Sequence, residues 1–473
     1  MNTDEFRTRA KETIDQIPSR PVVSTVEPNY LAPLIPTSAP LDPEPWSDIT
    51  ADIQSKIMPG ITNWSSPRFM AFFCCTSSYP SAIAEMWSTA FNGAHFNWIY
   101  SPAVTELEVI VMDWLAKLIG LPDCFLSKGP TNGGGVIHGS ASEAILTVMV
   151  AARNKFLASK TAQLSHGHSD AKDDEYWRLR SRLVVLGSAG THSSTKKAAQ
   201  ILGVRFIAIP VDEEHGFAMQ ASDLAQVLDG LTSRGLEPFF LTATLGTIEV
   251  CAVDDFTDIA DILVPKVNTP NDIWVHVDAA YAGSALVLDE NKHMAAPFKN
   301  FHSFNFNPQN VKPPYLQDQL SNDDRTVDYR DWQIPLARRF RSLKLWFVIR
   351  AYGVRGLQAH VRKGIVLGES LEAKLRSRPD LFSIMTCAHF GLLTFRLYAG
   401  GNEQLVNART EMLCERVNSG GRFFLTGTTV NGKFVIRVCA SGASASEEHI
   451  SRLFKLFVEE AERIIKGGES VTL

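Results

Sequence analysis

Two segments of the chain combine residue types that could bind a phosphorylated heterocycle. The glycine-rich stretch GGGVIHGSASEA (133–144) runs directly into a helical pattern, so backbone amides at a helix start, with the hydroxyls of Ser140 and Ser142, could hold an anion. The stretch HVDAAYAG (276–283) ends an apolar run in Asp278 and continues with small residues. Parallel sheets bind ligands beyond the carboxyl ends of their strands, where this carboxylate could pair with a protonated ring nitrogen.

Two further segments also follow predicted strands. THSS (191–194) contains His192, which could stack on a planar ring, and TLGTIEV (244–250) follows another apolar run. Each segment alone also has an ordinary structural explanation, such as a capped helix, an aspartate at a strand end or a hydrogen-bonded histidine. Their occurrence together and in this order is more specific than any one of them.

Continuous apolar runs alternate with helical patterns through the middle of the chain. The runs are RLVVLG (182–187), VRFIAIP (204–210), PFFLTAT (238–244) and DIWVHVD (272–278), and the helical stretches include residues 105–119, 140–157 and 220–232. Buried strands separated by helices are typical of a mainly parallel sheet with helices on both faces. The sequence therefore predicts an α/β fold.

Changes of pattern divide the chain into three parts. Residues 1–78 read as a proline-punctuated helical arm, too apolar and irregular to bury itself, so we expect it to pack on a second subunit. Residues 79–345 form the large α/β domain. Residues 346–473 form a small α+β domain with a long helix, the strands FGLLTFRL (390–397) and KFVIRVCA (433–440), and an amphipathic last helix.

The composition bears on partners and location. The 473 residues carry a formal charge of −5, which gives no reason to expect nucleic acid or an anionic membrane as a partner. No apolar run approaches the length of a bilayer span, and no secretory signal is visible. Seven scattered cysteines suggest reduced thiols in the cytoplasm, and no ligand spacing predicts a metal site.

The segments together resemble the group II pyridoxal-phosphate (PLP)-dependent decarboxylases, and most closely their aromatic-L-amino-acid branch. The resemblance covers nearly the whole chain and includes SSYPSAIAEM (77–86), FNWIYSPAVTELEVIVMDWLAKLIGLP (96–122), GGGVIHGSASEA, HVDAAYAGSA, SFNFNP (303–308) and VDYRDWQIPLARRFRSLKLWFVIRAYGV (327–354). It implies the PLP-dependent transferase fold of the aspartate-aminotransferase type (fold type I). That fold has a large domain with a seven-stranded mixed sheet, an N-terminal arm and a small C-terminal domain.

The resemblance also implies roles for individual residues. The positions that match the family's cofactor contacts are Ala141, Ser142, His192, Thr247, Asp278, Ala280 and Asn307. Ala141 and Ser142, with Asn307, would hold the phosphate. His192 would lie against the pyridine ring, and Asp278 would keep the ring nitrogen protonated so that the ring accepts electrons.

Substrate, products and assembly follow from the same resemblance. It implies an aromatic amino acid as substrate, an aryl-ethylamine and CO₂ as products, and a homodimer with sites at the subunit interface. Tyr315 matches the mobile-loop tyrosine that returns a proton to the substrate carbon. A phenylalanine there goes with aldehyde formation in this family, so Tyr315 favours simple decarboxylation. The positions expected at the substrate pocket are Trp64, Phe72, Phe73, Cys75, His95, Phe96 and Ala337.

One stretch departs from the family pattern. The family reads NFNPHKW at the cofactor lysine, whereas this chain reads NFNPQNV (305–311). Asn310 therefore falls in the lysine position, roughly two dozen family residues after it are missing, and an asparagine amide cannot form the Schiff base. Lys312 is the nearest substitute, about 6.5 Å further along an extended chain, although Pro313 and Pro314 stiffen the backbone beside it.

Three functions therefore stay open. The first is a PLP-dependent decarboxylase of aromatic L-amino acids. The second is a catalytically inactive homologue, or a truncated product lacking the Schiff-base lysine, that binds PLP without turnover. The third is an aromatic aldehyde synthase, against which Tyr315 argues.

Overall fold

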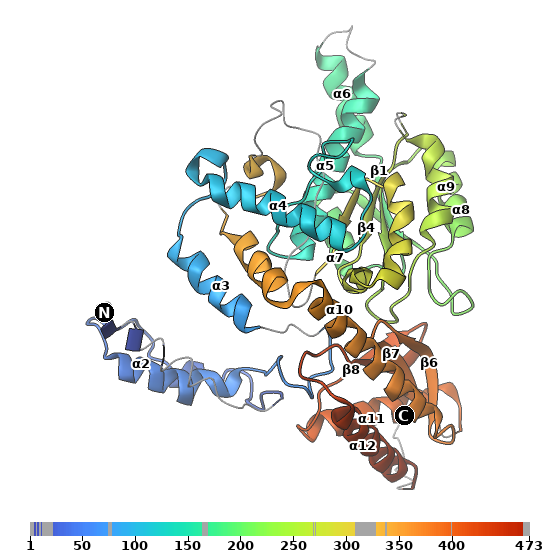
Figure 1. Cartoon of the computed structure of the whole chain (residues 1–473). Helices are drawn as coiled ribbons and strands as arrows, with labels where there is room; N and C mark the ends of the chain where they lie inside the picture. Colours follow the sequence, from blue (N-terminus) through green and yellow to red (C-terminus); the bar gives the residue numbers. More distant parts are fainter. Residues whose placement is uncertain are drawn as a thin grey trace.

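A computed structural model describes residues 22–307 and 328–466, apart from 74–77, 163–168, 268, 270, 336–337 and 399, together with five residues between 4 and 11. Figure 1 shows a sheet covered by helices, a second and smaller sheet domain beside it, and an N-terminal arm that extends away from both.

Five parallel strands form the sheet of the large domain. They are β1 (Leu183–Ser188), β2 (Arg205–Ile209), β3 (Glu237–Thr244), β4 (Trp274–Asp278) and β5 (Ser303–Asn305), in the order β2-β1-β3-β4-β5. The four apolar runs predicted as strands are confirmed. β1 and β4 are buried along their whole length, as central parallel strands are.

Helices cover both faces of this sheet (Figure 1). One layer contains α5 (Ala141–Thr161), α6 (Ser169–Arg180) and α7 (Ser193–Leu202), and the other contains α4 (Pro102–Leu118), α8 (Ala221–Ser233) and α9 (Phe256–Leu263). Successive strand residues point to opposite layers, since Val185 packs with the first and Val184 with the second. The three helical stretches predicted in this domain are confirmed as α4, α5 and α8.

The described residues supply five of the seven strands that the family resemblance implies. Residues 133–138, which lead into α5, are partly or fully buried, but side chains take up their polar groups. The Ile137 amide donates to Glu108 Oε1 at 2.9 Å, and the Ile137 carbonyl accepts from Arg341 at 2.6 Å. This segment is therefore held by charged side chains instead of a neighbouring strand. Residues 308–327, where the chain departs from the family pattern, lie outside the described residues.

The small domain contains an antiparallel sheet of four strands. The order is β6 (Phe382–His389), β7 (Leu392–Leu397), β9 (Lys433–Cys439) and β8 (Thr426–Val430), with α11 (Glu403–Ser419) and α12 (Glu447–Lys466) packed against it. The strands and the last helix predicted here are confirmed. α10 (Arg341–Arg376) joins the two domains and bends at Gly353, whose φ of 62° no ordinary helical residue adopts. The boundary predicted between residues 345 and 346 falls within α10.

The arm carries short helical segments. They are η1 (Ala32–Leu34), α2 (Trp46–Asp52), η2 (Ile53–Ile57) and η3 (Met58–Gly60), and α3 (Tyr79–Ala90) follows at the start of the large domain. Phe69 pairs with Phe424 through an isolated β-bridge, which ties the end of the arm to the small domain. No helix in the described part of the chain is long and apolar enough to cross a membrane.

Candidate active site

The carboxylate of Asp278 lies at the buried end of β4. Asp278 is 4% exposed, and its Oδ1 accepts a hydrogen bond from the Ala280 amide at 3.1 Å. Burial raises the pKa of Asp278 above its usual value, and the Ala280 amide, nearby His192 and the Asn305 side chain offset part of this rise. These three groups favour the charged carboxylate, which is the form that pairs with a protonated ring nitrogen.

Parallel pairing brings neighbouring strand ends to the edge that carries Asp278. Thr244 at the end of β3 and Asn305 at the end of β5 are its register partners. The chain beyond β5 stays at this edge, because the Asn307 amide donates to the Ala280 carbonyl at 3.1 Å. The structure therefore brings Asp278, Ala280 and Asn307 together, as the sequence analysis expects.

His192 and Thr247 come from the loops that follow β1 and β3. His192 caps α7: its Nδ1 accepts from the Ser194 amide at 3.2 Å and lies 2.6 Å from Ser194 Oγ, which fixes the ring. Its influence on the pKa of Asp278 places it near that carboxylate. Thr247 is buried, and its Oγ1 accepts from the Ala252 amide at 2.9 Å, so this hydroxyl holds its own loop in place.

Helix α5 points its N-terminus at the same edge. Its last turn lies at the opposite edge, because Lys160 forms an ion pair of 3.0 Å with Glu237 at the start of β3. The 21 residues of α5 extend over about 30 Å, somewhat more than the length of β3. Ala141 and Ser142 in its first turn therefore lie near the strand end that carries Asp278.

The first turn of α5 offers amides to an anion. Ser140 caps the helix, and its Oγ accepts from the Glu143 amide at 3.2 Å. The first amides of any helix have no carbonyl partner within it, so those of Ala141 and Ser142 can donate to a ligand, and the helix dipole favours negative charge there. The negative charge of Glu143 in this turn is bound within the protein, because its Oε2 accepts from the Gly139 amide at 2.8 Å.

These groups fit a phosphorylated pyridine. A buried carboxylate suits a ring nitrogen that carries a proton, a fixed imidazole suits a ring face, and a helix start suits a phosphate. The methyl group of Ala280 leaves space beside Asp278 that a larger side chain would fill. An α/β sheet that gathers these groups at its carboxyl edge has the organisation of a PLP-dependent enzyme.

The predicted substrate-pocket residues of the arm lie in two places. Trp64 stacks with Phe72 at a ring distance of 5.8 Å, and Phe72 faces Phe424 of the small domain at 6.3 Å. Phe73 instead stacks on Tyr281 at 4.4 Å, three residues beyond Asp278. Phe73 is thus the arm residue that the fold brings towards the candidate cofactor site.

His95 and Phe96 lie in a third place, the loop between α3 and α4. His95 is buried, and its ring nitrogens lie 3.0 Å from Ser101 Oγ and 3.0 Å from the Phe91 carbonyl. The Phe96 ring meets Tyr100 edge-on at 4.9 Å. Within one chain, these contacts hold the loop and do not join the two residues to Asp278.

Several predicted residues lie outside the described part of the chain. They are Cys75, Asn310, Lys312, Tyr315 and Ala337. Their roles stay predictions.

Sequence reasoning missed two buried polar clusters near the site. His276, Ser303 and Asn305 form hydrogen bonds on the sheet face that carries Asp278. Glu108 and Arg338 form an ion pair whose side chains are each 1% exposed. Polar residues at positions i and i+2 of buried strands, as in HVD and SFN, were the available signal for the first cluster. The ion pair has no local signal, because its partners are 230 residues apart.

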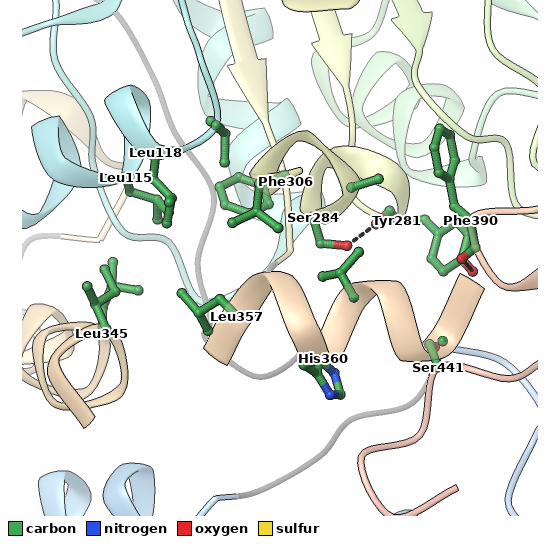
Figure 2. A pocket seen from close by; sticks show the side chains of 16 residues that line it. Leu115, Leu118, Tyr281, Ser284, Phe306, Leu345, Leu357, His360, Phe390 and Ser441 are labelled. Carbon is green, nitrogen blue, oxygen red and sulfur yellow. Dashed lines mark hydrogen bonds between the residues drawn. The ribbon is translucent and has the colours of Figure 1, made fainter. Parts of the chain in front are cut away.

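An apolar cavity of about 90 Å³ lies between the turn after β4 and helix α10. Figure 2 shows Phe306, Ser284 and Tyr281 on one side of it and Leu357 of α10 on the other. None of the residues matched to the cofactor lines it. Its lining residues Tyr281 and Phe306 directly adjoin Ala280 and Asn307 in the sequence, so the cavity lies next to the candidate active site.

Comparisons with known proteins agree with this organisation. The family model described as "Pyridoxal-dependent decarboxylase conserved domain" matches residues 28–311 and 309–398. The chain is 39% identical to the aromatic-L-amino-acid decarboxylase of Cavia porcellus, over 98% of this chain and 99% of that protein. It is 38% identical to tyrosine decarboxylase 2 of Narcissus pseudonarcissus, over 99% and 96% respectively.

Solved structures give the same result. Tryptophan decarboxylase of Catharanthus roseus, in complex with L-tryptophan, matches with a TM-score of 0.87 at 35% identity, over 98% of this chain and 99% of that one. The 4-hydroxyphenylacetaldehyde synthase of Rhodiola rosea matches with a TM-score of 0.89 at 32% identity, over the same shares. The chain belongs to the PLP-dependent decarboxylase family, and its cofactor is PLP. The resemblance, the fold class and the cofactor predicted from sequence are confirmed.

Proposed function

We propose that this chain decarboxylates aromatic L-amino acids to aryl-ethylamines and CO₂. The observation that carries the proposal is the buried Asp278 carboxylate beside His192 at the carboxyl edge of the sheet. Relatives with more than a third of their residues identical are named as decarboxylases of aromatic-L-amino acids or tyrosine. That similarity supports the aromatic class and does not select one amino acid within it.

Each part of the site has a distinct task in this proposal. PLP, when bound, supplies an electron sink for the bond that breaks as CO₂ leaves. Asp278 holds a proton on the ring nitrogen, which makes that sink effective. His192 would cover one ring face, and the first turn of α5 would hold the phosphate. Tyr315 would return a proton to the substrate carbon, as the family resemblance implies.

A second candidate is an aldehyde synthase. Phenylacetaldehyde synthase of Arabidopsis thaliana is 38% identical to this chain, and the Rhodiola rosea structure is also named as an aldehyde synthase. The two reactions differ in their products: the decarboxylase releases CO₂ and an amine, whereas the synthase consumes O₂ and water and releases CO₂, an aldehyde, ammonia and hydrogen peroxide. We expect the purified chain with PLP and tyrosine, tryptophan or dopa to release CO₂ without hydrogen peroxide.

The covalent attachment of PLP is the part of the proposal in which this chain departs from the family pattern. The two pieces matched by the family model meet at residues 309–311, and the alignment with the Cavia porcellus protein spans 497 positions against 473 residues in the chain. Both facts agree with a family segment missing after Asn310. The active alternative then requires Lys312 to form the Schiff base, whereas the inactive alternative binds PLP without a covalent bond.

Borohydride reduction followed by peptide mass spectrometry separates these alternatives. A phosphopyridoxyl group on Lys312, absent from a Lys312→Ala variant, would support an active decarboxylase. Cofactor that leaves on denaturation after reduction, with no CO₂ release from any aromatic amino acid, would contradict it and favour the inactive homologue.

We also propose that the chain forms a homodimer through its N-terminal third. Among the described residues, 20 of the 28 exposed large apolar side chains lie between Val26 and Trp114. They include Trp87 on α3 and Trp114 on α4, which are 50% and 42% exposed. An exposed apolar surface of this extent is typical of a subunit interface. A second copy that covers it would also bring arm residues to a neighbouring active site. Cytoplasmic location stays a prediction.

A further inference from the structure

A chain of buried hydrogen bonds leads through the sheet to Asp278. The Trp274 indole donates to Ser303 Oγ at 2.8 Å, Ser303 Oγ lies 2.8 Å from His276 Nδ1, and His276 Nε2 lies 2.7 Å from Asn305 Oδ1. His276, Ser303 and Asn305 are each 0% exposed. His276 and Asp278 are two residues apart in β4, so their side chains share one face of the sheet.

The donor and acceptor of each of these hydrogen bonds follow from the chemistry of the side chains. An indole nitrogen only donates, so Ser303 Oγ accepts from Trp274 and its own proton is left for His276 Nδ1. A neutral imidazole that accepts at Nδ1 carries its proton on Nε2, and the Asn305 oxygen accepts that proton. Burial lowers the pKa of His276 to about 4, so the ring is neutral at physiological pH.

The amide group of Asn305 is the last link. Its oxygen accepts from His276, so its Nδ2 points elsewhere; this nitrogen is buried, and no atom of the described residues accepts a hydrogen bond from it. Asn305 pairs with Asp278 in register, and its side chain lowers the pKa of that carboxyl. A buried amide donor beside a carboxylate favours the charged form of the carboxylate.

We propose that His276 and Asn305 are positioning residues that hold an amide donor towards Asp278, and so keep its carboxylate charged and oriented for the cofactor's ring nitrogen. Without the imidazole, the Asn305 amide is free to turn its oxygen towards Asp278. Two oxygens facing each other would favour a protonated carboxyl, which cannot hold a proton on the ring. The inference rests on the proposed function, because it assumes that PLP lies at Asp278.

The test compares PLP binding to the full-length chain with three variants. His276→Phe keeps an aromatic ring and removes both hydrogen bonds, whereas His276→Gln keeps an amide donor for Asn305. Thr242→Val is the matched control. Thr242 is also 0% exposed and is the register partner of His276, but it bonds to Thr195 and takes no part in the hydrogen bonds from Trp274 to Asn305. The readouts are the dissociation constant of PLP by fluorescence titration and the ¹⁵N chemical shift of its labelled ring nitrogen.

His276→Phe should weaken PLP binding by about tenfold, the usual effect of losing a hydrogen bond to a charged group, and move the ¹⁵N shift towards neutral pyridine. His276→Gln and Thr242→Val should keep the wild-type shift. If His276→Phe does not fold, Ser303→Ala removes only the hydroxyl and should move the shift in the same direction. A wild-type shift in both His276→Phe and Ser303→Ala, or in the one that folds, would overturn the inference alone. Wild-type protein that binds no PLP would overturn the proposed function as well.

Discussion

Replacing Arg338 by methionine tests whether its ion pair with Glu108 stabilises the segment before α5. Arg338 and Glu108 form a buried ion pair, and Glu108 Oε1 also accepts from the Ile137 amide, four residues before Ala141. The Arg338 guanidinium lies 4.2 Å from the centre of the Tyr329 ring. Methionine keeps much of the apolar stem of this side chain and removes its charge.

The expected cost comes from the carboxylate that is left behind. Removing one partner of a buried ion pair costs about 3–5 kcal/mol, because the other charge stays buried without compensation. In the double variant Glu108→Gln with Arg338→Met, no charge remains and the oxygen of the introduced amide can still accept from Ile137. We therefore expect the double variant to lose only about 1–2 kcal/mol.

Urea denaturation followed by tryptophan fluorescence, at fixed protein and PLP concentrations, measures both values. The single variant should be less stable than the double variant by about 1–4 kcal/mol. A single variant within about 0.5 kcal/mol of wild type, or a double variant that is no more stable than the single one, would contradict this expectation.

Three further predictions concern pH, the loop after β3 and assembly. Because burial lowers the pKa of His276 from 6.5 to about 4, the unfolded chain binds its proton more tightly. Its contribution to stability is therefore full above pH 6.5 and falls towards pH 4. Wild type should lose about 2 kcal/mol more than His276→Gln between pH 7 and 5 in urea titrations, and equal losses would contradict this. Asp254 accepts from two backbone amides, but burial raises its pKa from 3.8 to about 7, so the folded chain binds its proton more tightly than the unfolded chain and stability falls as pH rises towards 7. Wild type should therefore lose about 2 kcal/mol more than Asp254→Asn between pH 5 and 7 by the same assay, and equal changes would count against it. Trp87→Glu should convert the dimer to a monomer in sedimentation, whereas Trp177→Glu, at a residue 60% exposed outside the apolar region, should not.

Local sequence was sufficient for the parts of the fold that must be buried. The run DIWVHVD is apolar because β4 is covered on both faces, so its place in the sheet and the position of Asp278 at its end could be predicted. Helix α5 was predictable for a similar reason, since its capping serine and small residues mark a helix start.

Contacts between distant parts of the chain were not predictable in this way. The amide and the carbonyl of Ile137, before α5, bond to Glu108 and Arg341, which are 29 and 204 residues away in the sequence. The hydrogen bonds from His276 to Ser303 and Asn305 depend on the register of β4 and β5, which the sequence of either strand alone does not predict. The family resemblance supplied what pattern alone did not, namely the cofactor and the residues matched to it.

A crystal structure of the chain grown with PLP would show directly whether Asp278 faces the cofactor. We expect the ring nitrogen within hydrogen-bond distance of Asp278, the imidazole of His192 against one ring face, and the phosphate on the amides of Ala141 and Ser142. A cofactor bound in the apolar cavity beside α10, or one whose ring nitrogen faces away from Asp278, would contradict this expectation.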